Sequence, residues 1–485
     1  MASLKSSPSK TEQERPPLLL TQNIQACLGL FANLTKLGDL ASLLDKFGYA
    51  RCWTPRVTLW AMMLSHLLRH KATLAQVVTA LSKGMGDCLC MPGKELSTQL
   101  AHGVSTSAYS QARARLPLPW LRHCLGAQAQ SLSSLATGWQ WRSLRVMLLD
   151  GTLIGLRSVG DIPRWFPPAS NQHGKAYWCQ MRVLGCVCLG TGLVLATVMG
   201  PTTHSEQAQA VRLILHGLGT LQRSSLLWMG DRNFGVWRVV AAARQRQTHI
   251  MVRLTHERAL KLSARHGLKP GLDLAVNWSP SRHDTVDRTL QIQAVAGRLL
   301  VVCCQRCGFR PVQLLLFTTL TDASLYPLDA LAALYARRWQ IELSFRQIKA
   351  QMGLGRLEVK TTVMAKRELY AGLMAYNLVR GVMLVSSAHC AVILGRLSFA
   401  TAMAQLAETL RLLGAPHSAA QTQARLLEMI RNTGRGLLPR RTKPRPVEPR
   451  RKRHLRESFP PLQGSRTIAR QLLEKDRLTA STTKS

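Results

Sequence analysis

Apolar residues recur at helical spacing over residues 21–135, roughly the first quarter of the chain. Within this stretch, Thr54 followed by Pro55 predicts a helix over 57–69, because threonine caps helices and proline fits their first position. The polar leader before it, residues 1–22, has no such pattern and is expected to be disordered.

Two further helices are expected in the same region. Thr73 and Gln76 have the spacing of a capping box, which opens a helix. Residues 105–116 (STSAYSQARARL) form the next helix, with Arg113 and Arg115 near its end. A compact helical module with basic residues can place a helix in a DNA groove. The alternative is a helical cap packed on the main domain.

The pattern changes near Arg145, where short apolar runs begin to alternate with helical periods. Three strands, a helix, a strand, a helix and a strand predict a mixed α/β sheet. The expected strands are 146–149, 181–189, 193–199, 226–229 and 250–254, and the expected helices are 206–218 and 236–245.

One uncharged run, residues 183–200, reaches the lower limit for a membrane span. Its centre is Gly190-Thr191-Gly192, a typical tight turn between two apolar strands. The run is therefore predicted to be a β-hairpin, and no membrane association is expected.

After the sheet the alternation stops. Residues 256–312 contain short runs such as 289–295 and 299–304 and are expected to form a β-rich insertion. The next expected elements are a strand over 312–319 and one long amphipathic helix over 327–352. The pattern of apolar residues predicts further helices up to about Ile430.

Composition narrows the class of partner. The chain of 485 residues carries 64 Lys and Arg against 25 Asp and Glu, a formal net charge of +39. Its hydrophobic fraction of 46% excludes general disorder. A folded protein this basic should bind polyanions, with nucleic acid as the first candidate and a membrane surface as the second. Ten Lys or Arg, four prolines and one acid between 435 and 456 indicate a solvated basic tail.

The first twenty residues lack a long apolar core, so no signal peptide is expected. Scattered cysteines without an export signal favour reduced thiols and a cytoplasmic location. Three cysteine clusters are interpreted as small buried hydrophobes rather than zinc ligands, because no partner follows at a finger-like distance. They are Cys88/Cys90, Cys186/Cys188 and Cys303/Cys304/Cys307.

Two acids follow apolar strands directly. Asp150 and Asp231 each end a buried run and precede small or polar residues. In open α/β sheets, functional groups gather beyond the carboxyl ends of strands. Two converging carboxylates would raise each other's pKa unless a divalent cation lay between them. The alternative is that each aspartate only caps the turn after it.

The long helix adds a polar stripe. At about 100° per residue, Tyr335, Arg338, Glu342 and Lys349 share an arc of about 60° beside the apolar face. A carboxylate flanked by two cations and a phenol suits a site that holds a metal and a phosphate together. The alternative is a surface Arg–Glu pair of little consequence.

These motifs together resemble a known family. DGT at 150–152, GDRNF at 230–234 and the Y-x2-R-x3-E-x6-K pattern at 335–349 are similar to the three catalytic blocks of DDE transposases of the insertion-sequence-four family. The last block is the most specific, because it fixes four residue types at three spacings. The likeness spans about 140–390, and the helical segment with SAYSQARARL also resembles that family.

The resemblance implies an RNase H-like core in which Asp150, Asp231 and Glu342 bind two Mg²⁺ or Mn²⁺ ions. Hard oxygen ligands suit such cations. It also implies that Tyr335, Arg338 and Lys349 hold DNA phosphates and that Trp339 stacks on a displaced base. Ordinary packing is the alternative for the tryptophan.

The implied fold class is α/β, an RNase H-like core with a mixed sheet, a β-rich insertion before the last catalytic helix, and helical regions at both ends. The expected domains are a leader (1–22), a helical DNA-binding domain (23–140), the catalytic domain (141–390) with its insertion at about 256–312, a helical C-terminal region (391–434) and a basic tail (435–485).

The implied reaction is cut-and-paste transposition on double-stranded DNA, with cleavage at element ends and strand transfer to a target. The resemblance also implies that the protein is a homodimer when bound to DNA and that it is located in the bacterial cytoplasm, associated with the nucleoid. Two alternatives stay open: an inactive DNA-binding remnant and a general metal-dependent nuclease.

Overall fold

The computed structural model describes most of the chain between residues 52 and 439. The leader, Cys88, Cys90, Cys307 and nearly all of the basic tail lie outside the described residues. The described residues are 52–68, 72–85, 87, 95–101, 106–135, 138–168, 170–171, 174–175, 178–218, 225–264, 266–282, 284, 289–291, 293–304, 312–413, 418–439, 465, 467–468 and 471–472.

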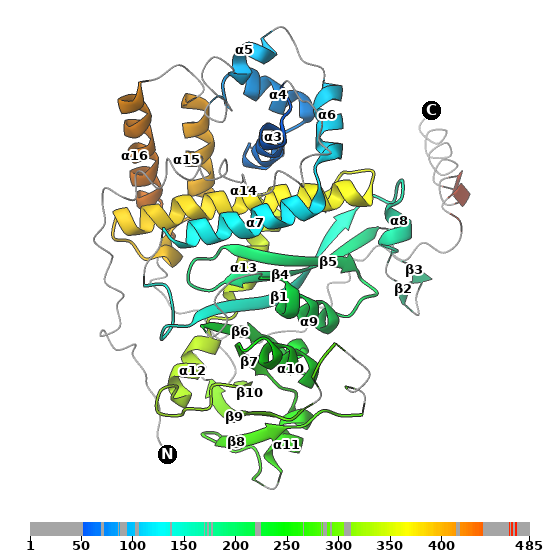
Figure 1. The fold of residues 1–485 in the computed structure, drawn as a ribbon, viewed down its shortest axis with the longest axis vertical. Coiled ribbons are helices and arrows are strands. Elements are labelled where there is room, and N and C mark those ends of the chain that lie inside the picture. Colours follow the sequence, from blue (N-terminus) through cyan, green and yellow to red (C-terminus); the bar gives the residue numbers. More distant parts are fainter. Residues whose placement is uncertain are drawn as a thin grey trace, which may run out of the picture. The chain divides into compact units, whose positions relative to one another are not determined.

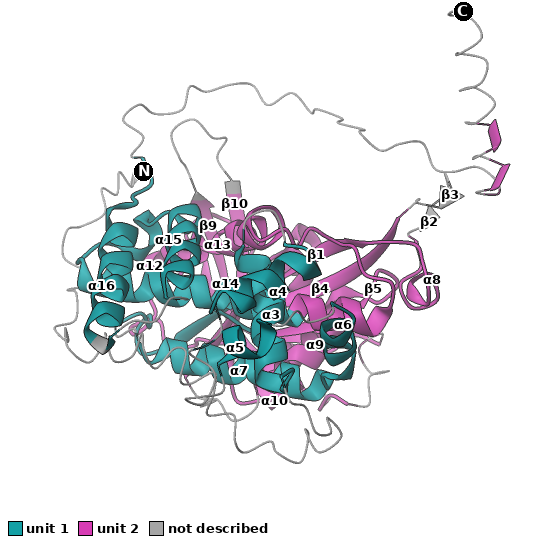
Figure 2. Ribbon diagram, turned by 90° about the horizontal axis from the view of Figure 1, so that it is seen from above, with its two compact units in different colours: residues 1–147, 187–195, 370–440 teal, residues 148–186, 196–369, 441–485 magenta. Residues whose placement is uncertain are grey.

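The chain divides into two compact units, coloured in Figure 2. Unit 1 contains residues 1–147, 187–195 and 370–440, and unit 2 contains 148–186, 196–369 and 441–485. The N-terminal and C-terminal helical regions, which the sequence separates, therefore share one unit. The residues proposed for catalysis all lie in unit 2.

Unit 1 is helical, and its helices begin where the sequence places their caps. The Thr54 side chain accepts a hydrogen bond from the Val57 amide, and Thr73 and Gln76 form the expected capping box. The helices are α3 (Pro55–Leu67), α4 (Leu74–Ser82), α5 (Leu96–Leu100), α6 (Thr106–Arg115), α7 (Leu118–Ser133), α14 (Thr362–His389, which starts in unit 2), η7 (Leu394–Arg396), α15 (Phe399–Leu412) and α16 (Ala419–Arg435).

Helix α14 is the one described helix long and apolar enough to cross a membrane by length and composition. Its apolar window is 94% buried inside the structure, which is the property of a core helix. A buried Asn377 on this helix bonds both the amide and the carbonyl of Val194, at 2.8 Å each. This helix is therefore explained by packing within the protein.

Unit 2 is built on a mixed sheet whose described strands run in the order β5-β4-β1-β6-β7-β10-β9-β8 (Figure 1). The first five strands have the sequence order 3-2-1-4-5 of an RNase H-like core, and β6 and β7 are parallel. The fold class expected from the sequence is thus confirmed. The strands are β1 (Arg145–Leu156), β4 (Cys179–Cys188), β5 (Val194–Pro201), β6 (Leu226–Gly230), β7 (His249–Arg253), β8 (Asp273–Trp278), β9 (Val295–Cys304), β10 (Val312–Thr318) and β11 (Arg356–Leu357).

Helices α9 and α10 lie side by side in front of the strands in Figure 1, while α13 lies behind them. The α13 residue Phe345 packs on Gly185 of β4, where an added Cβ would lie 3.1 Å from its ring. The remaining elements are α8 (Ile162–Trp165), α9 (Glu206–His216), η5 (Arg232–Phe234), α10 (Trp237–Gln245), α11 (His256–Ser263), α12 (Leu328–Tyr335), α13 (Gln340–Arg346), η6 (Gln347–Gln351) and the small ribbon β2 (Ser170–Asn171) with β3 (Gly174–Lys175).

The uncharged run 183–200 is the expected hairpin. Strands β4 and β5 are joined by a tight turn in which the Gly192 amide donates to the Cys188 carbonyl at 2.7 Å. Gly192 has φ +72°, a conformation that glycine adopts without strain. Cys186 and Cys188 are buried thiols, as expected, whereas Cys303 is exposed.

The insertion differs from the sequence expectation in its form. It begins with helix α11, and β9 starts at Val295, so residues 289–294 form no strand where described. Strands β8, β9 and β10 pair antiparallel and extend the central sheet beyond β7. Strand β8 was missed because it lies at the sheet edge, where its residues are mostly exposed or half-buried.

Two further expectations are corrected. Strand β1 does not end at Asp150 but continues to Leu156, and its last two residues, Gly155 and Leu156, pair in parallel with β11. The helix expected over 327–352 is broken into α12, a tight turn over 336–339, α13 and a π-helical turn, η6. The apolar period is similar on both sides of the break, so periodicity alone does not reveal it.

Candidate active site

Asp150 lies within β1, at the point where the buried half of the strand gives way to half-buried positions. One of its carboxylate oxygens accepts a hydrogen bond from the Gly151 amide at 2.8 Å. Burial raises the pKa of this carboxyl to about 6, and the charges of Asp231 and Glu342 add to the increase, while Arg338 opposes it. The two other acids of the expected triad therefore act on Asp150 directly.

Asp231 directly follows β6, as the sequence predicts. Its carboxylate accepts a hydrogen bond from the Asn233 amide at 2.8 Å and so caps the short helix η5. The capping role considered as an alternative is thus present. The same hydrogen bond fixes the direction of the carboxylate, so capping and a catalytic role are compatible here.

The last motif reaches the end of β6 through Tyr335. Its hydroxyl donates to the Gly230 carbonyl at 3.2 Å, which ties the end of α12 to the residue before Asp231. The tyrosine is buried, and burial raises its pKa, so it stays protonated at neutral pH. One turn later, Arg338 bonds Glu342 at 2.7 Å, with 56% of the Glu342 side chain exposed.

The two remaining motif residues differ in their surroundings. Lys349, in the π-helical turn, donates to the Thr152 hydroxyl of the DGT motif at 3.4 Å. This bond links the last motif to the first. Trp339 is 50% exposed, so core packing, the alternative considered from the sequence, does not account for it.

A cavity of ≈ 470 Å³ brings several of these side chains together. Asp231, Tyr335, Arg338 and Trp339 line it, and so do two arginines that the sequence analysis did not select, Arg232 and Arg253. Arg253 ends strand β7, a strand-end position like the one that identified Asp231, and could have been found in that way. Three guanidinium groups around one aspartate make the cavity suited to a phosphate.

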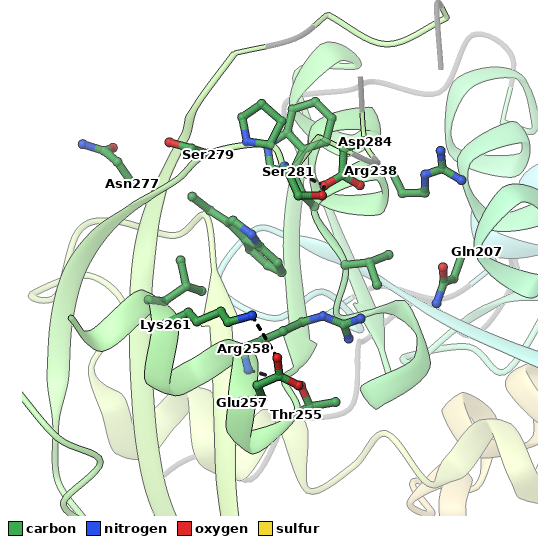
Figure 3. Close-up of a pocket in the computed structure, with 15 residues that line it drawn as sticks. Gln207, Arg238, Thr255, Glu257, Arg258, Lys261, Asn277, Ser279, Ser281 and Asp284 are labelled. Atoms are coloured by element: carbon green, nitrogen blue, oxygen red, sulfur yellow. Dashed lines mark hydrogen bonds and ion pairs between the residues drawn. The ribbon is translucent and has the colours of Figure 1, made fainter. Parts of the chain in front are cut away.

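A larger cavity, of ≈ 850 Å³, lies beside α11 and β8 (Figure 3). It contains none of the three acids. Two of its charged residues, Glu257 and Lys261, are paired with each other at 2.8 Å, and Arg258 donates to the Gly235 carbonyl at 3.2 Å. Its charges are largely engaged within the protein, so it is not the better candidate for catalysis.

The donor set is chemically suited to Mg²⁺ or Mn²⁺, which prefer carboxylate oxygens. Burial is the main cause of the raised pKa of Asp150, and repulsion from Asp231 and Glu342 adds to it; a bound cation would relieve both. Among the described residues, however, no three His, Cys, Asp or Glu side chains are grouped to hold one ion together. Mg²⁺ is often held by one or two carboxylates plus substrate phosphates, so the residues present fit such an ion.

Comparison with known proteins finds relatives of the chain that are transposases. The family described as Transposase DDE domain matches residues 141–378, which include all three acids and the whole last motif. The transposase InsG for insertion sequence element IS4 of Escherichia coli (strain K12) is 26% identical over 374 residues, covering 73% of this chain and 78% of that protein.

Among solved structures, a piggyBac transposase synaptic complex with hairpin DNA matches with a TM-score of 0.42 and 12% identity, over 86% of this chain and 87% of that one. The family match and the InsG relationship carry the assignment. The family match covers the segment in which DGT, GDRNF and the tyrosine-to-lysine motif occur in order. The chain thus carries a transposase DDE domain over residues 141–378 and is similar in sequence to the insertion-sequence-four transposase InsG.

Proposed function

We propose that this transposase performs cut-and-paste transposition, with Asp150, Asp231 and Glu342 as its catalytic acids. It would cut DNA at the ends of its own element and join the freed ends to a target. The observation that carries the proposal is the arginine-lined cavity in which Asp231 meets Tyr335, Arg338 and Trp339. The charges of Asp231, Glu342 and Arg338 also reach Asp150.

The three acids would hold two Mg²⁺ or Mn²⁺ ions. When bound, such a pair lowers the pKa of the attacking water or 3′-hydroxyl and stabilises charge on the leaving oxygen in an in-line displacement. The contribution of the chain is to place the carboxylates. Asp150 is fixed by the Gly151 amide and Asp231 by the Asn233 amide, both at 2.8 Å.

Arg338, Tyr335 and Lys349 are proposed to hold phosphates near the cut. In the structure Arg338 bonds Glu342 at 2.7 Å. A guanidinium can grip a phosphate by two hydrogen bonds, so a strand entering the cavity would compete for Arg338. Arg338 would then release Glu342, whose carboxylate becomes available as a ligand.

Trp339 is proposed to stack on a displaced base, which its exposure allows. The helices of residues 23–140 are proposed to contribute DNA binding, and α6 presents exposed polar positions over Thr106–Arg115. We also propose that the protein acts as a homodimer bound to two DNA ends. Its location would be the bacterial cytoplasm, at the nucleoid.

The test is a gel assay with duplexes that carry the terminal sequences of the element. Asp150→Ala, Asp231→Ala and Glu342→Ala should each reduce metal-dependent cleavage by several orders of magnitude while end binding survives. Asp329→Ala, an exposed acid in the first turn of α12, is the matched control and should cleave normally. Full cleavage by any of the three variants would overturn the assignment of that residue.

The same assay separates the alternatives. A general nuclease cuts duplexes that lack the element ends and yields no joined products, whereas a transposase requires the ends. An inactive remnant binds the ends without cutting them. The family relationship does not favour either alternative.

A further inference from the structure

Glu206 is a fourth acid beside the candidate active site. It is the first residue of α9, directly after the N-cap Ser205. Its carboxylate accepts a hydrogen bond from the Asn233 side-chain amide at 2.5 Å. Asn233 is the residue whose backbone amide fixes Asp231, so Glu206 holds the loop that carries the second catalytic aspartate.

The same carboxylate also lies against the DGT motif. A Cβ built on Gly151 would lie 2.8 Å from the carboxyl carbon of Glu206, with a carboxylate oxygen closer still. Glycine at 151 therefore leaves the space that Glu206 occupies. The Glu206 side chain thus contacts both Gly151, which follows Asp150, and Asn233, whose backbone amide binds Asp231.

Arg182 of β4 holds Glu206 from a third direction. Its guanidinium lies 3.7 Å from the other carboxylate oxygen, and it donates to the His204 carbonyl just before α9. Only 20% of the Arg182 side chain and 26% of the Glu206 side chain are exposed, so solvent weakens their attraction less than at the open surface. The adjacent Gln207 donates to the Asn233 carbonyl at 3.1 Å, a second tie from α9 to this loop.

We propose that Glu206 is a positioning residue that holds the Asp150 segment of β1 and the loop of Asp231 at a fixed separation, and so sets the metal affinity of the site. The inference rests on the proposed function and deepens it. Its chemistry is that of an outer carboxylate that orients ligand-bearing groups without binding the ion. Removal of such a group typically costs about 10- to 100-fold in metal affinity or activity.

Three variants of the full chain separate this role from others. Glu206→Ala removes all the interactions of the carboxylate. Glu206→Gln keeps an oxygen that can accept from Asn233 but removes the charge. Gly151→Ala leaves Glu206 intact and pushes its flexible end out of its place. The control is Glu257→Gln, an exposed acid of α11 that contacts neither the Asp150 segment nor the Asp231 loop.

The first measurement is Mn²⁺ binding to the purified protein, followed by the free-Mn²⁺ signal in electron paramagnetic resonance. The second is the Mg²⁺ concentration that gives half-maximal end cleavage. Glu206→Ala and Gly151→Ala should each weaken both by about 10- to 100-fold, and Glu206→Gln should recover most of the affinity. The double variant Gly151→Ala/Glu206→Ala should be no worse than the worse single variant, because both disturb the same interaction.

Unchanged Mn²⁺ affinity in Glu206→Ala would overturn the proposal, even if the variant melted at a lower temperature. A decrease in Glu206→Gln as large as in Glu206→Ala would also overturn it, because the hydrogen bond to Asn233, which glutamine can keep, would then contribute nothing to metal affinity. Absence of cleavage by the unmodified chain would count against the proposed function alone, since the Mn²⁺ titration still decides the role of Glu206.

Discussion

Asp150 shows how a residue proposed for catalysis can oppose the stability of its own protein. Its carboxyl is partly buried, and burial together with Asp231 and Glu342 raises its pKa to about 6. The fold therefore prefers the protonated acid, while metal binding requires the ionised form. The free energy of unfolding of the metal-free protein should reflect this conflict.

The substitution Asp150→Asn tests it in protein freed of metal by EDTA. Because the folded pKa lies above the unfolded value of 3.8, ionisation destabilises the fold progressively as the pH rises from about 4 to 6, and fully above that. Asparagine keeps the acceptor for the Gly151 amide and carries no charge. The variant should unfold with a free energy about 1–2 kcal/mol higher at pH 7.5, and the gain should vanish near pH 3.5. Denaturant unfolding at both pH values measures it; an equal gain at both would contradict the explanation.

Trp339 allows a second prediction at this scale. Since half of its surface is exposed, Trp339→Ala should leave the melting temperature almost unchanged. If the ring stacks on a base, cleavage should fall by about 5- to 150-fold, the equivalent of ~1–3 kcal/mol. Trp165→Ala is the matched control, because that tryptophan is 58% exposed in the same unit and lies outside the cavity. Equal cleavage by both variants would remove Trp339 from the DNA interface.

The residues of the site were partly readable from the sequence. Asp231 and Tyr335 were found because a strand-end position and a spaced motif mark them. Glu206 and Asn233 were missed, because their importance comes from an interaction between segments that one-dimensional spacing does not show. Arg253 was also missed, although its position at the end of β7 is the kind of signal that identified Asp231.

At the scale of elements, Arg298 joins the insertion to the segment that precedes the last motif. This β9 residue is 3% exposed and forms a two-bond ion pair with Asp273 of β8. It also donates to the Leu320 and Tyr326 carbonyls, at 3.2 and 2.8 Å, in the turn before α12. These hydrogen bonds fix the start of that helix against the insertion.

Arg298→Ala should therefore destabilise the protein by about 3–5 kcal/mol, because it leaves Asp273 and two carbonyls without their partner. Lys261→Ala removes an exposed i,i+4 pair with Glu257 and should leave the free energy of unfolding almost unchanged. Denaturant unfolding of both variants compares a buried with an exposed ion pair. Similar small decreases in the two would show that the Arg298 side chain does not hold the fold.

Elements with a strong local signal were predictable, and those set by distant partners were not. The strand 226–229 and the helix 206–218 correspond to β6 and α9 because apolar period and caps agree there. The far end of β1 pairs with β11, some 200 residues later in the chain, and no local pattern shows such a pairing. The break after Tyr335 coincides with the bond of its hydroxyl to β6, a tertiary interaction.

At the scale of the whole molecule, the formal net charge of +39 favours polyanions as partners but does not tell one polyanion from another. That charge was evident from composition. Which cations meet DNA depends on the fold, and within the described part of the chain the cavity with Arg232, Arg253 and Arg338 is the place where cations gather around a candidate catalytic acid.

Truncation after Leu438 tests the contribution of the basic tail, whose cations lie mostly beyond the described residues. For each phosphate that the tail neutralises, its removal should reduce the slope of log K against log salt by about 0.9. The truncated chain should thus bind DNA ends with a visibly flatter salt dependence, measured by fluorescence anisotropy from low to moderate salt. An unchanged slope would exclude the tail from the interface.

The π-helical turn over Gln347–Gln351 gives the spacing of the last motif a concrete meaning. Such a turn amounts to one residue added to an ordinary helix. If that surplus residue were deleted, Lys349 would rotate by about 100° and its ammonium would leave the Thr152 hydroxyl. The six residues between the glutamate and the lysine of the motif are therefore the number that lets the lysine ammonium reach the Thr152 hydroxyl. In a relative that has the same motif residues but fewer residues between the glutamate and the lysine, another residue would have to supply the positive charge at this position.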